Sequence, residues 1–351
     1  MPALDAVLEK QEVYYQAEDP TAEDNTPIKL RNNKFTQLFE SLTGMYGWPN
    51  YGEFDPTPIL APFFLLFFAM CMGDCGYGIL LMIIGVLIAK KKLNIEMFDG
   101  LGPIITVLGV GTTVVGFFLG TFMGIDLYNA EWMPQALKSV MIKGEVMGYD
   151  IQMVLALCIG VFHICLAMVV KAICYTKQFG FKENIATWGW TLLIVGGLLV
   201  AILGMTVLPA AVFKWAIIAV GTVSALAIYI FNTPGRNPLI NIGAGLWDTY
   251  NMATGILGDV LSYIRLYALG LAGGMLGAAF NNLGLMVMGG STEGATWQWL
   301  PFVLILVLGH VLNLAMSALG AFVHPLRLSF VEYFKNAGYE GKGTLYKPFK
   351  K

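Results

Sequence analysis

Long apolar runs separated by short polar segments fill most of the chain after its first 57 residues. A helix needs about 20 apolar residues to cross a bilayer, and every run reaches that length. In order, the runs are 58–89, 101–124, 151–175, 188–208, 212–231, 246–289 and 297–331. The pattern predicts an all-α, polytopic membrane protein whose last two apolar runs form two long C-terminal helices.

The first of these runs leaves two alternatives open. Residues 58–89 are apolar except for Asp74, which lies in the glycine-containing segment Gly73–Gly78. One interpretation is a single long helix, and the other is a hairpin that turns at the glycines. Each arm of the hairpin would have about 16 residues and measure roughly 24 Å, which a locally thinned bilayer accommodates.

Lys and Arg favour the cytoplasmic side, so the charged segments between the runs indicate which side each segment faces. An odd or even number of crossings in 58–89 then decides the side of the N-terminus. The basic segments are Lys90–Lys92, 171–182, Arg236 and the lysine-rich tail after Glu332. The external side is assigned to Gly290–Ala295, which has no Lys or Arg. One span in 58–89 would place the N-terminus outside, whereas two spans leave both termini in the cytoplasm. A 57-residue lead without a signal peptide is easier to leave in the cytoplasm, so we predict about eight transmembrane helices, with Asp74 near an external turn.

This topology divides the chain into three parts. Residues 1–57 are polar and mixed, with a polar patch at Glu18–Asn25, and are predicted to be a cytoplasmic lead-in segment without a signal peptide. Residues 58–335 form the transmembrane domain, and residues 336–351 form a cytoplasmic tail.

The composition agrees with a membrane protein. Hydrophobic residues make up 57% of the chain and charged residues only 13%, about half the share of a soluble domain. A net charge of −2 without a basic cluster gives no support for a nucleic-acid partner. The cysteines have no zinc-type spacing and are interpreted as membrane-interior residues: Cys71, Cys75, Cys158, Cys165 and Cys174.

A single arginine stands out in the run 246–289, which contains only two other charges, Asp248 and Asp259. Arg265 is about 20 helical residues, or roughly 30 Å, from either end of the run, so its side chain cannot reach either membrane surface. A charge at the bilayer centre costs about 2.5–3.5 kcal/mol on insertion scales, and such residues usually mark ion pathways. Arg265 therefore predicts ion transport.

Polar side chains in the last two runs fall on narrow helical faces. In the last run the polar residues lie within an arc of about 100°: His310, Asn313, Ser317, His324 and Arg327. In the preceding run they lie within about 140°: Asp248, Asn251, Asp259, Ser262 and Arg265. Neighbouring helices or lipid headgroups could satisfy these groups, but the alignment favours the wall of a hydrated pathway. Small residues after Arg265, from Ala268 to Ala279, allow another backbone to approach closely.

Other chemistry finds little support in the sequence. The glycines lie within apolar runs and not at a strand–helix junction, so no nucleotide-binding loop is predicted. A Ser/His/Asp hydrolase needs its catalytic partners placed together, and the three histidines, all in apolar runs, give little support for one. His163 is isolated on an apolar helix and is interpreted as a satisfied interior residue.

Several motifs together resemble the membrane half of the large subunit of V/A-type rotary ATPases, which is subunit a in eukaryotes and subunit I in prokaryotes. The motifs are DPTP (55–58), PFF (62–64), GDCGYG (73–78), LSYIRLYAL (261–269), GAFVHPLRL (320–328), FVEYF (330–334) and YEGKG (339–343). The resemblance runs from about Asn33 to the C-terminus and is closer to the prokaryotic form.

This resemblance implies a function for the transmembrane domain. Arg265 would be the stator arginine that faces a rotating ring of proteolipid subunits, with Arg327 as the second arginine of the pair. Two aqueous half-channels would carry H⁺ or Na⁺ to and from the ring, without a cofactor or a bound metal. The half-channel candidates are Asp74, Asn251, Asp259, Ser262, His310, Asn313, Ser317 and His324.

The resemblance also implies partners and a location. The partners would be the proteolipid ring, the central-stalk and peripheral-stalk subunits and the lipid bilayer. The chain would not be an enzyme on its own, but a subunit of an ATP-driven or ATP-synthesising translocase in a prokaryotic cytoplasmic membrane.

Two departures from the family pattern affect the interpretation. The large N-terminal cytoplasmic domain of the family is expected to be absent. Neutral Asn251 and Ser317 stand where eukaryotic members have acidic residues, and Gly273 stands in place of a histidine. The sequence therefore does not determine whether the transported ion is H⁺ or Na⁺.

A stand-alone secondary transporter or channel is the alternative function, although the halves of the chain show no convincing inverted repeat. A purely structural membrane anchor is the third hypothesis.

Overall fold

The computed structural model describes residues 8–12, 14, 26–91, 100–206, 209–231, 238–289 and 296–347. Four features discussed above lie outside these residues: the polar patch 18–25, Arg236, the segment 290–295 and the last lysines of the tail. Within them the protein is helical apart from two short β-hairpins, which confirms the all-α prediction.

The first main elements are α2 (Lys34–Tyr46), α3 (Thr57–Met72), α4 (Cys75–Ala89) and α5 (Gly102–Leu119). Two antiparallel hairpins and a short helix follow: β1 (Thr121–Phe122), β2 (Ile125–Asp126), α6 (Gln135–Lys138), β3 (Glu145–Val146) and β4 (Tyr149–Asp150). The next elements are α7 (Ile151–Phe179), α8 (Ile185–Thr191), the π-helix η2 (Leu192–Gly196), α9 (Gly197–Thr206) and α10 (Ala210–Ile230). The last are α11 (Pro238–Ser262), α12 (Ile264–Val287), η3 (Thr296–Gln298), α13 (Trp299–Arg327), the π-helix η4 (Leu328–Tyr333) and α14 (Phe334–Ala337).

Six helical segments of the described chain are long and apolar enough to cross a membrane. They begin at Gly102, Ile151, Ile185, Ala211, Asn241 and Trp299. The last two contain 47 and 39 residues, which confirms the two long C-terminal helices. The two helices of the first apolar run are shorter, with 16 residues in α3 and 15 in α4, so the number of eight spans is not confirmed.

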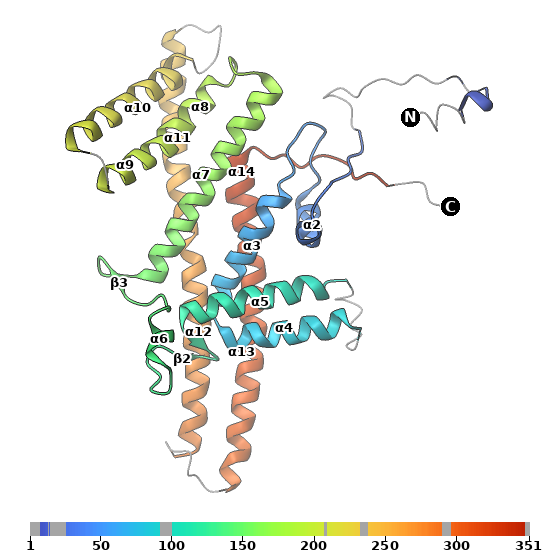
Figure 1. Cartoon of the computed structure of the whole chain (residues 1–351), viewed down its shortest axis with the longest axis vertical. Coiled ribbons are helices and arrows are strands. Elements are labelled where there is room, and N and C mark those ends of the chain that lie inside the picture. The colour runs from blue at the N-terminus through green and yellow to red at the C-terminus, as the bar shows by residue number, and fades with distance from the viewer. Residues whose placement is uncertain are drawn as a thin grey trace.

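The first run breaks at Gly73–Asp74, as the hairpin interpretation requires. Gly73 ends α3 with a left-handed φ of 58°, and Asp74 begins α4 by accepting hydrogen bonds from its first amides. The two helices do not pack along each other, however. In Figure 1, α3 follows the long axis of the molecule, whereas α4 and α5 run across it.

The α4–α5 pair is held by close backbone contact at glycines. A Cβ on Gly109 would come within 2.4 Å of the Met82 nitrogen, and one on Gly116 within 2.3 Å of the Cys75 nitrogen. In the sequence, Gly116, Gly120 and Gly124 repeat every four residues, a spacing that predicts a close helix–helix contact. Gly116 makes such a contact, but the repeat does not continue along the helix. Gly120 ends α5 with a φ of 74°, and Gly124 lies in the β1–β2 turn, because the helix has already stopped at Leu119.

The N-terminal segment and the C-terminal tail contact each other beyond the end of α14. Ile28 pairs with Leu345, and Trp48 with Gly343, in isolated β-bridges. The Tyr339 hydroxyl donates to the Gly47 carbonyl at 2.8 Å. The boundaries of the predicted cytoplasmic parts, and the side of the membrane they face, stay predictions.

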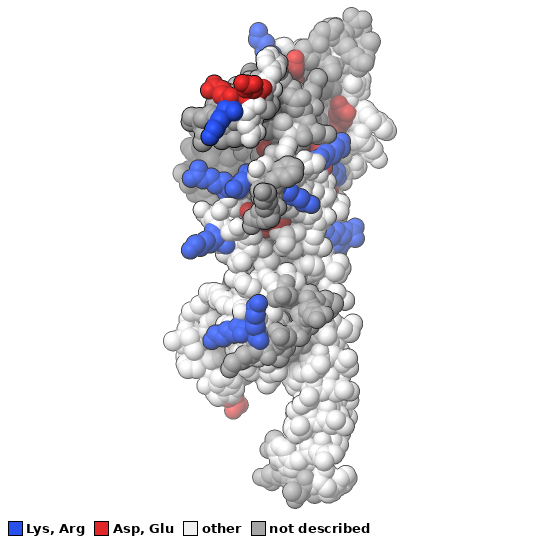
Figure 2. Space-filling model, turned by 90° about the vertical axis from the view of Figure 1, so that its right-hand side faces the viewer, with Lys and Arg blue, Asp and Glu red and all other residues white. Residues whose placement is uncertain are grey.

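Charge is distributed unevenly along the long axis. In Figure 2, Lys and Arg side chains spread over the upper and middle parts of the molecule, whereas the lower ends of α12 and α13 show none on the visible face. Large apolar side chains are exposed at this end of α13, including Leu300, Leu304 and Leu308. Such a surface suits a lipid or protein environment rather than water.

Candidate functional site

Arg265 lies in the first turn of α12, two residues beyond the break that separates α12 from α11. One terminal nitrogen of its guanidinium, Nη1, is buried and has no hydrogen-bond partner among the described residues. Nor does Arg265 belong to any ion pair in that part of the chain, where the pairs are Lys143–Asp126, Lys335–Asp259 and Lys342–Glu340. An unpaired charge in this position is costly and is unlike a permanent structural ion pair.

Arg327 is exposed at the last residue of α13, where the helix continues as the π-helix η4. Single turns of π-helix occur often at functional sites. His324 lies one turn before Arg327 and interacts electrostatically with both Arg265 and Arg327. The two predicted arginines therefore lie around a shared histidine, although they are on different helices.

A cluster of carboxylates and their partners joins α11 to η4 and α14 on one side of Arg265. We call it the α11–η4 cluster, and it consists of Asp259, Ser262, Glu332, Lys335 and Asn336. Asp259 Oδ2 accepts a hydrogen bond from Asn336 Nδ2 at 2.7 Å and lies 3.5 Å from Lys335 Nζ. Glu332 is 2% exposed and interacts with Ser262, while its Oε2 is buried without a partner. A buried carboxylate with a free oxygen can accept a proton or contact a cation.

Sequence reasoning missed Glu332 because the last apolar run was taken to end at Val331. The helical segment in fact continues to Ala337, so Glu332 is a buried residue of the helix and not the start of the tail. Helical geometry could have found it, since at 100° per residue Glu332 falls about 40° from His310, next to the predicted polar stripe.

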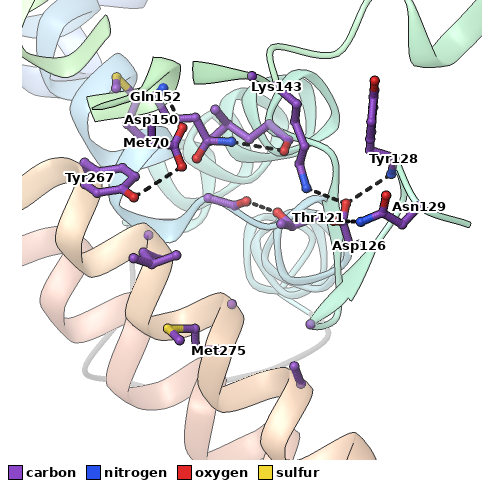
Figure 3. Close-up of a pocket in the computed structure, with 18 of the residues that line it drawn as sticks. Met70, Thr121, Asp126, Tyr128, Asn129, Lys143, Asp150, Gln152, Tyr267 and Met275 are labelled. Carbon is purple, nitrogen blue, oxygen red and sulfur yellow. Dashed lines mark hydrogen bonds and ion pairs between the residues drawn. The ribbon is translucent and has the colours of Figure 1, made fainter. Parts of the chain in front are cut away.

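A cavity with a charged wall is lined by α12 from Tyr267 onward, two residues beyond Arg265. We call it the α12 cavity; its volume is about 620 Å³, and its walls come from α12, α7 and the two β-hairpins (Figure 3). On α12 it is lined by the small residues Gly270, Gly274 and Ala278 and by the larger Tyr267, Leu271 and Met275. Its charged wall consists of Asp126, Lys143, Glu145 and Asp150. Three carboxylates against one ammonium leave an excess of negative charge, which favours cations.

Two interactions cross the α12 cavity. Lys143 forms an ion pair with Asp126, and the Tyr267 hydroxyl donates to Asp150 Oδ2 at 3.2 Å, as Figure 3 shows. Tyr267 is only two residues after Arg265. This cavity was not predictable from the sequence, because its acidic residues come from the segment 125–150, which resembles an ordinary polar loop until it folds against α12.

The polar stripe of α13 is brought together, and His310, Asn313 and Ser317 in it are linked by hydrogen bonds. Asn313 Nδ2 donates to the Tyr77 hydroxyl at 2.8 Å and to the Gly273 carbonyl at 2.9 Å, and Ser317 donates to Asn313 Oδ1 at 3.2 Å. His310 bonds to Tyr77 through Nδ1 and to Asn281 through Nε2, at 2.8 and 3.0 Å. These side chains connect α13 to α4 and α12. Their predicted role in ion conduction stays a prediction.

Two candidates remain, Asp74 next to this network and Asn251 away from it. Asp74 is 1% exposed and accepts hydrogen bonds from four backbone amides, those of Gly76, Tyr77, Met123 and Gly124. With its oxygens used in this way, Asp74 holds the start of α4 against the β1–β2 turn. Asn251 is exposed on α11, well before the break at Tyr263.

Arg265 is partly buried, and its unpaired charge lies along α11 and α12 between two acidic regions, the α11–η4 cluster and the α12 cavity. Comparison with known proteins identifies the family. The chain belongs to the V-type ATPase 116kDa subunit family, which it matches over residues 3–133 and 249–351. The resemblance found in the sequence is thereby confirmed.

Relatives in this family are subunits of ATP synthases. The A-type ATP synthase subunit I of Pyrococcus abyssi is 33% identical over 96% of this chain and 49% of its own length. The A-type ATP synthase subunit I of Methanocaldococcus jannaschii is 32% identical over 93% of this chain and 49% of its own length. The V-type ATP synthase subunit I of Borreliella burgdorferi is 30% identical over 96% of this chain and 56% of its own length. The chain thus spans about half the length of the curated relatives that it matches.

Proposed function

We propose that this chain is the ion-translocating stator subunit of a V/A-type rotary ATPase or ATP synthase. The observation that carries the proposal is the position of Arg265. Along one helical axis it lies between the α11–η4 cluster, which ends at Ser262, and the α12 cavity, which begins at Tyr267. Two acidic regions that are separated by one fixed positive charge are what a two-half-channel mechanism requires.

In this proposal a carboxylate of a partner ring loads and unloads an H⁺ or Na⁺ as it passes α12. The α12 cavity forms the outer half-channel, because its excess of negative charge attracts cations toward the small-residue face of the helix. The α11–η4 cluster forms the inner half-channel, where Asp259 and the free oxygen of Glu332 provide acceptors for the ion.

Arg265 separates the two half-channels. A nearby positive charge favours the ionised form of a carboxyl group, so a ring carboxylate that reaches Arg265 releases its ion before it moves on. The same charge repels a cation that would otherwise pass directly from one half-channel to the other. Arg327 and His324 extend the polar surface on α13. The chain itself carries out no bond chemistry, and the energy comes from the ATPase subunits that the proposal assigns as partners.

Two experiments test this function against a stand-alone transporter. The assembled complex, purified from membranes, should contain a small membrane subunit with an essential carboxyl group, and transport into vesicles should require both that subunit and ATP. Transport by this chain alone in vesicles would contradict the proposal. A requirement for Na⁺ in ATP-driven transport identifies Na⁺ as the coupling ion, and its absence identifies H⁺.

A substitution tests the inner half-channel directly. Glu332→Gln keeps the size of the side chain but removes its charge, and should lower ATP-driven transport per assembled complex. Glu131→Gln is the matched control, because Glu131 is exposed in the loop between β2 and α6. Equal transport by the two variants would remove Glu332 from the pathway.

A further inference from the structure

The helix that carries Arg265 is interrupted at a single residue, Tyr263. The amide of Tyr263 donates to the Val260 carbonyl, and that of Leu266 to the Tyr263 carbonyl, both at 3.1 Å. These bonds span three residues instead of four, so the helix tightens just before the arginine. Sharp helix irregularities have identifiable causes, most often proline, and there is none between Pro238 and Pro301 in this sequence. Two local features accompany the break: Ser262 Oγ donates to the Gly258 carbonyl at 3.1 Å, and the Tyr263 side chain is held by another helix.

The Tyr263 side chain is anchored to α7. It is fully buried, and its hydroxyl forms a 2.8 Å hydrogen bond with Nδ1 of His163. Gly160, three residues before His163, leaves room for the phenol ring: a Cβ there would lie 2.4 Å from it. Tyr263 thus packs its ring against Gly160 of α7 and bonds its hydroxyl to His163 of the same helix.

His163 is itself fixed on every side by aromatic rings. Its imidazole stacks on Tyr333 of η4 at 4.5 Å with an interplanar angle of 10°, and it contacts Phe63 and Phe67 of α3 at 4.2 and 5.1 Å. His163 is 1% exposed, so its ring is shielded from solvent. Burying a polar ring nitrogen is unfavourable unless it is bonded, so the bond to Tyr263 is strongly maintained.

We propose that His163 is a positioning residue that sets the location of Arg265 through the Tyr263 hydroxyl. Tyr263 lies two residues before Arg265, and Tyr333 lies six residues after Arg327, so one imidazole contacts both segments that carry the arginines. The inference rests on the proposed function, since it concerns the placement of the stator arginine. It also gives His163 a role beyond that of a satisfied interior histidine.

The test measures ATP-driven ion transport and ATP hydrolysis in the same membrane vesicles, both expressed per assembled complex. Tyr263→Phe keeps the ring and removes only the hydroxyl. We expect it to lower the ratio of transport to hydrolysis about tenfold, because small displacements of a functional group have large effects on rate. His163→Phe should act similarly, whereas His163→Asn, which keeps a polar atom near the position of Nδ1, should restore most of the ratio.

The control is Tyr229→Phe, which removes a hydroxyl that bonds α10 to Thr249 of α11 at 3.2 Å, far along the chain from Arg265. A purely structural role of His163 would lower the amount of assembled complex and leave the ratio unchanged in every variant; that result overturns the inference. Arg265→Gln in the same vesicles separates the two proposals. If Arg265→Gln abolishes transport while Tyr263→Phe and His163→Phe keep the wild-type ratio, only the positioning role fails. If Arg265→Gln transports normally, the proposed function fails.

Discussion

The Tyr77 hydroxyl of α4 lies 2.8 Å from Nδ1 of His310 on α13, and the same oxygen accepts a 2.8 Å hydrogen bond from Asn313. One phenol therefore joins the transverse α4–α5 pair to a long C-terminal helix at two points, 233 and 236 residues away in sequence. Because both partners are at least partly buried, neither finds water easily when the hydroxyl is removed.

Tyr77→Phe should destabilise the protein by about 2–4 kcal/mol, since it removes two hydrogen bonds and leaves buried partners unsatisfied. Thermal unfolding of the purified protein in detergent measures the loss as a lower Tm. Tyr250→Phe on α11 serves as the control, because Tyr250 is 62% exposed. Similar Tm values for the two variants would show that the contact with His310 and Asn313 is not stabilising.

The polar stripe on α13 was predictable because helical periodicity is a local property. Positions 310, 313 and 317 share a face in any regular helix, and the structure does connect them. Their partner Tyr77 was not predictable from periodicity, since the hydrogen bonds depend on how α4 crosses α13. In the same way, hydropathy located the apolar runs but not the divergence of α3 and α4 at Gly73–Asp74.

The role of Asp74 shows the same limit. A carboxylate in an apolar run indicates function in general, and we predicted a half-channel position for it. Two of its four amide donors come from Met123 and Gly124, about 50 residues later, and only the folded chain brings them there. The α12 cavity and the His163–Tyr263 bond likewise join segments that are distant in sequence.

Asp74→Asn separates a capping role from a half-channel role. An amide nitrogen cannot accept a hydrogen bond, so at least one of the four donors loses its acceptor, at a cost of about 1–3 kcal/mol. If Asp74 acts as a cap, hydrogen exchange at residues 121–126 should accelerate while transport per assembled complex is retained. Loss of transport with unchanged exchange would instead assign Asp74 to the ion pathway.

Gly109→Ala should push α4 and α5 apart. The added Cβ would lie 2.4 Å from the Met82 backbone nitrogen, and backbone cannot move aside as a flexible side chain can. We expect a net destabilisation of about 1–2 kcal/mol, because overpacking outweighs the better helix propensity of alanine. Gly221→Ala on α10 is the matched control, since a Cβ there meets nothing within 4 Å. If Gly109→Ala unfolds at the same temperature as Gly221→Ala or higher, the close packing of α4 on α5 is refuted.

Tyr339 makes the contact between the C-terminal tail and Gly47 sensitive to alkaline pH. Burial, with nearby Glu53 and Asp55, raises the pKa of the Tyr339 phenol above its ordinary value. The neutral phenol donates to Gly47, so its contribution is complete below the unfolded pKa of about 10 and is lost as the pH rises beyond it. Unfolding temperatures measured from pH 8 to 11 should therefore fall more steeply for the wild type than for Tyr339→Phe. Parallel curves for the two proteins, with exposed Tyr51→Phe as reference, would exclude this linkage.

The central claim is that the unpaired charge of Arg265 governs ion movement between two acidic regions. ATP-driven ion transport per assembled complex, compared between Arg265→Gln and Arg31→Gln, tests it most directly, because Arg31 is an exposed arginine of the N-terminal segment. The account predicts that Arg265→Gln assembles but does not transport, while Arg31→Gln transports like the wild type. Normal transport by an assembled Arg265→Gln complex would contradict it.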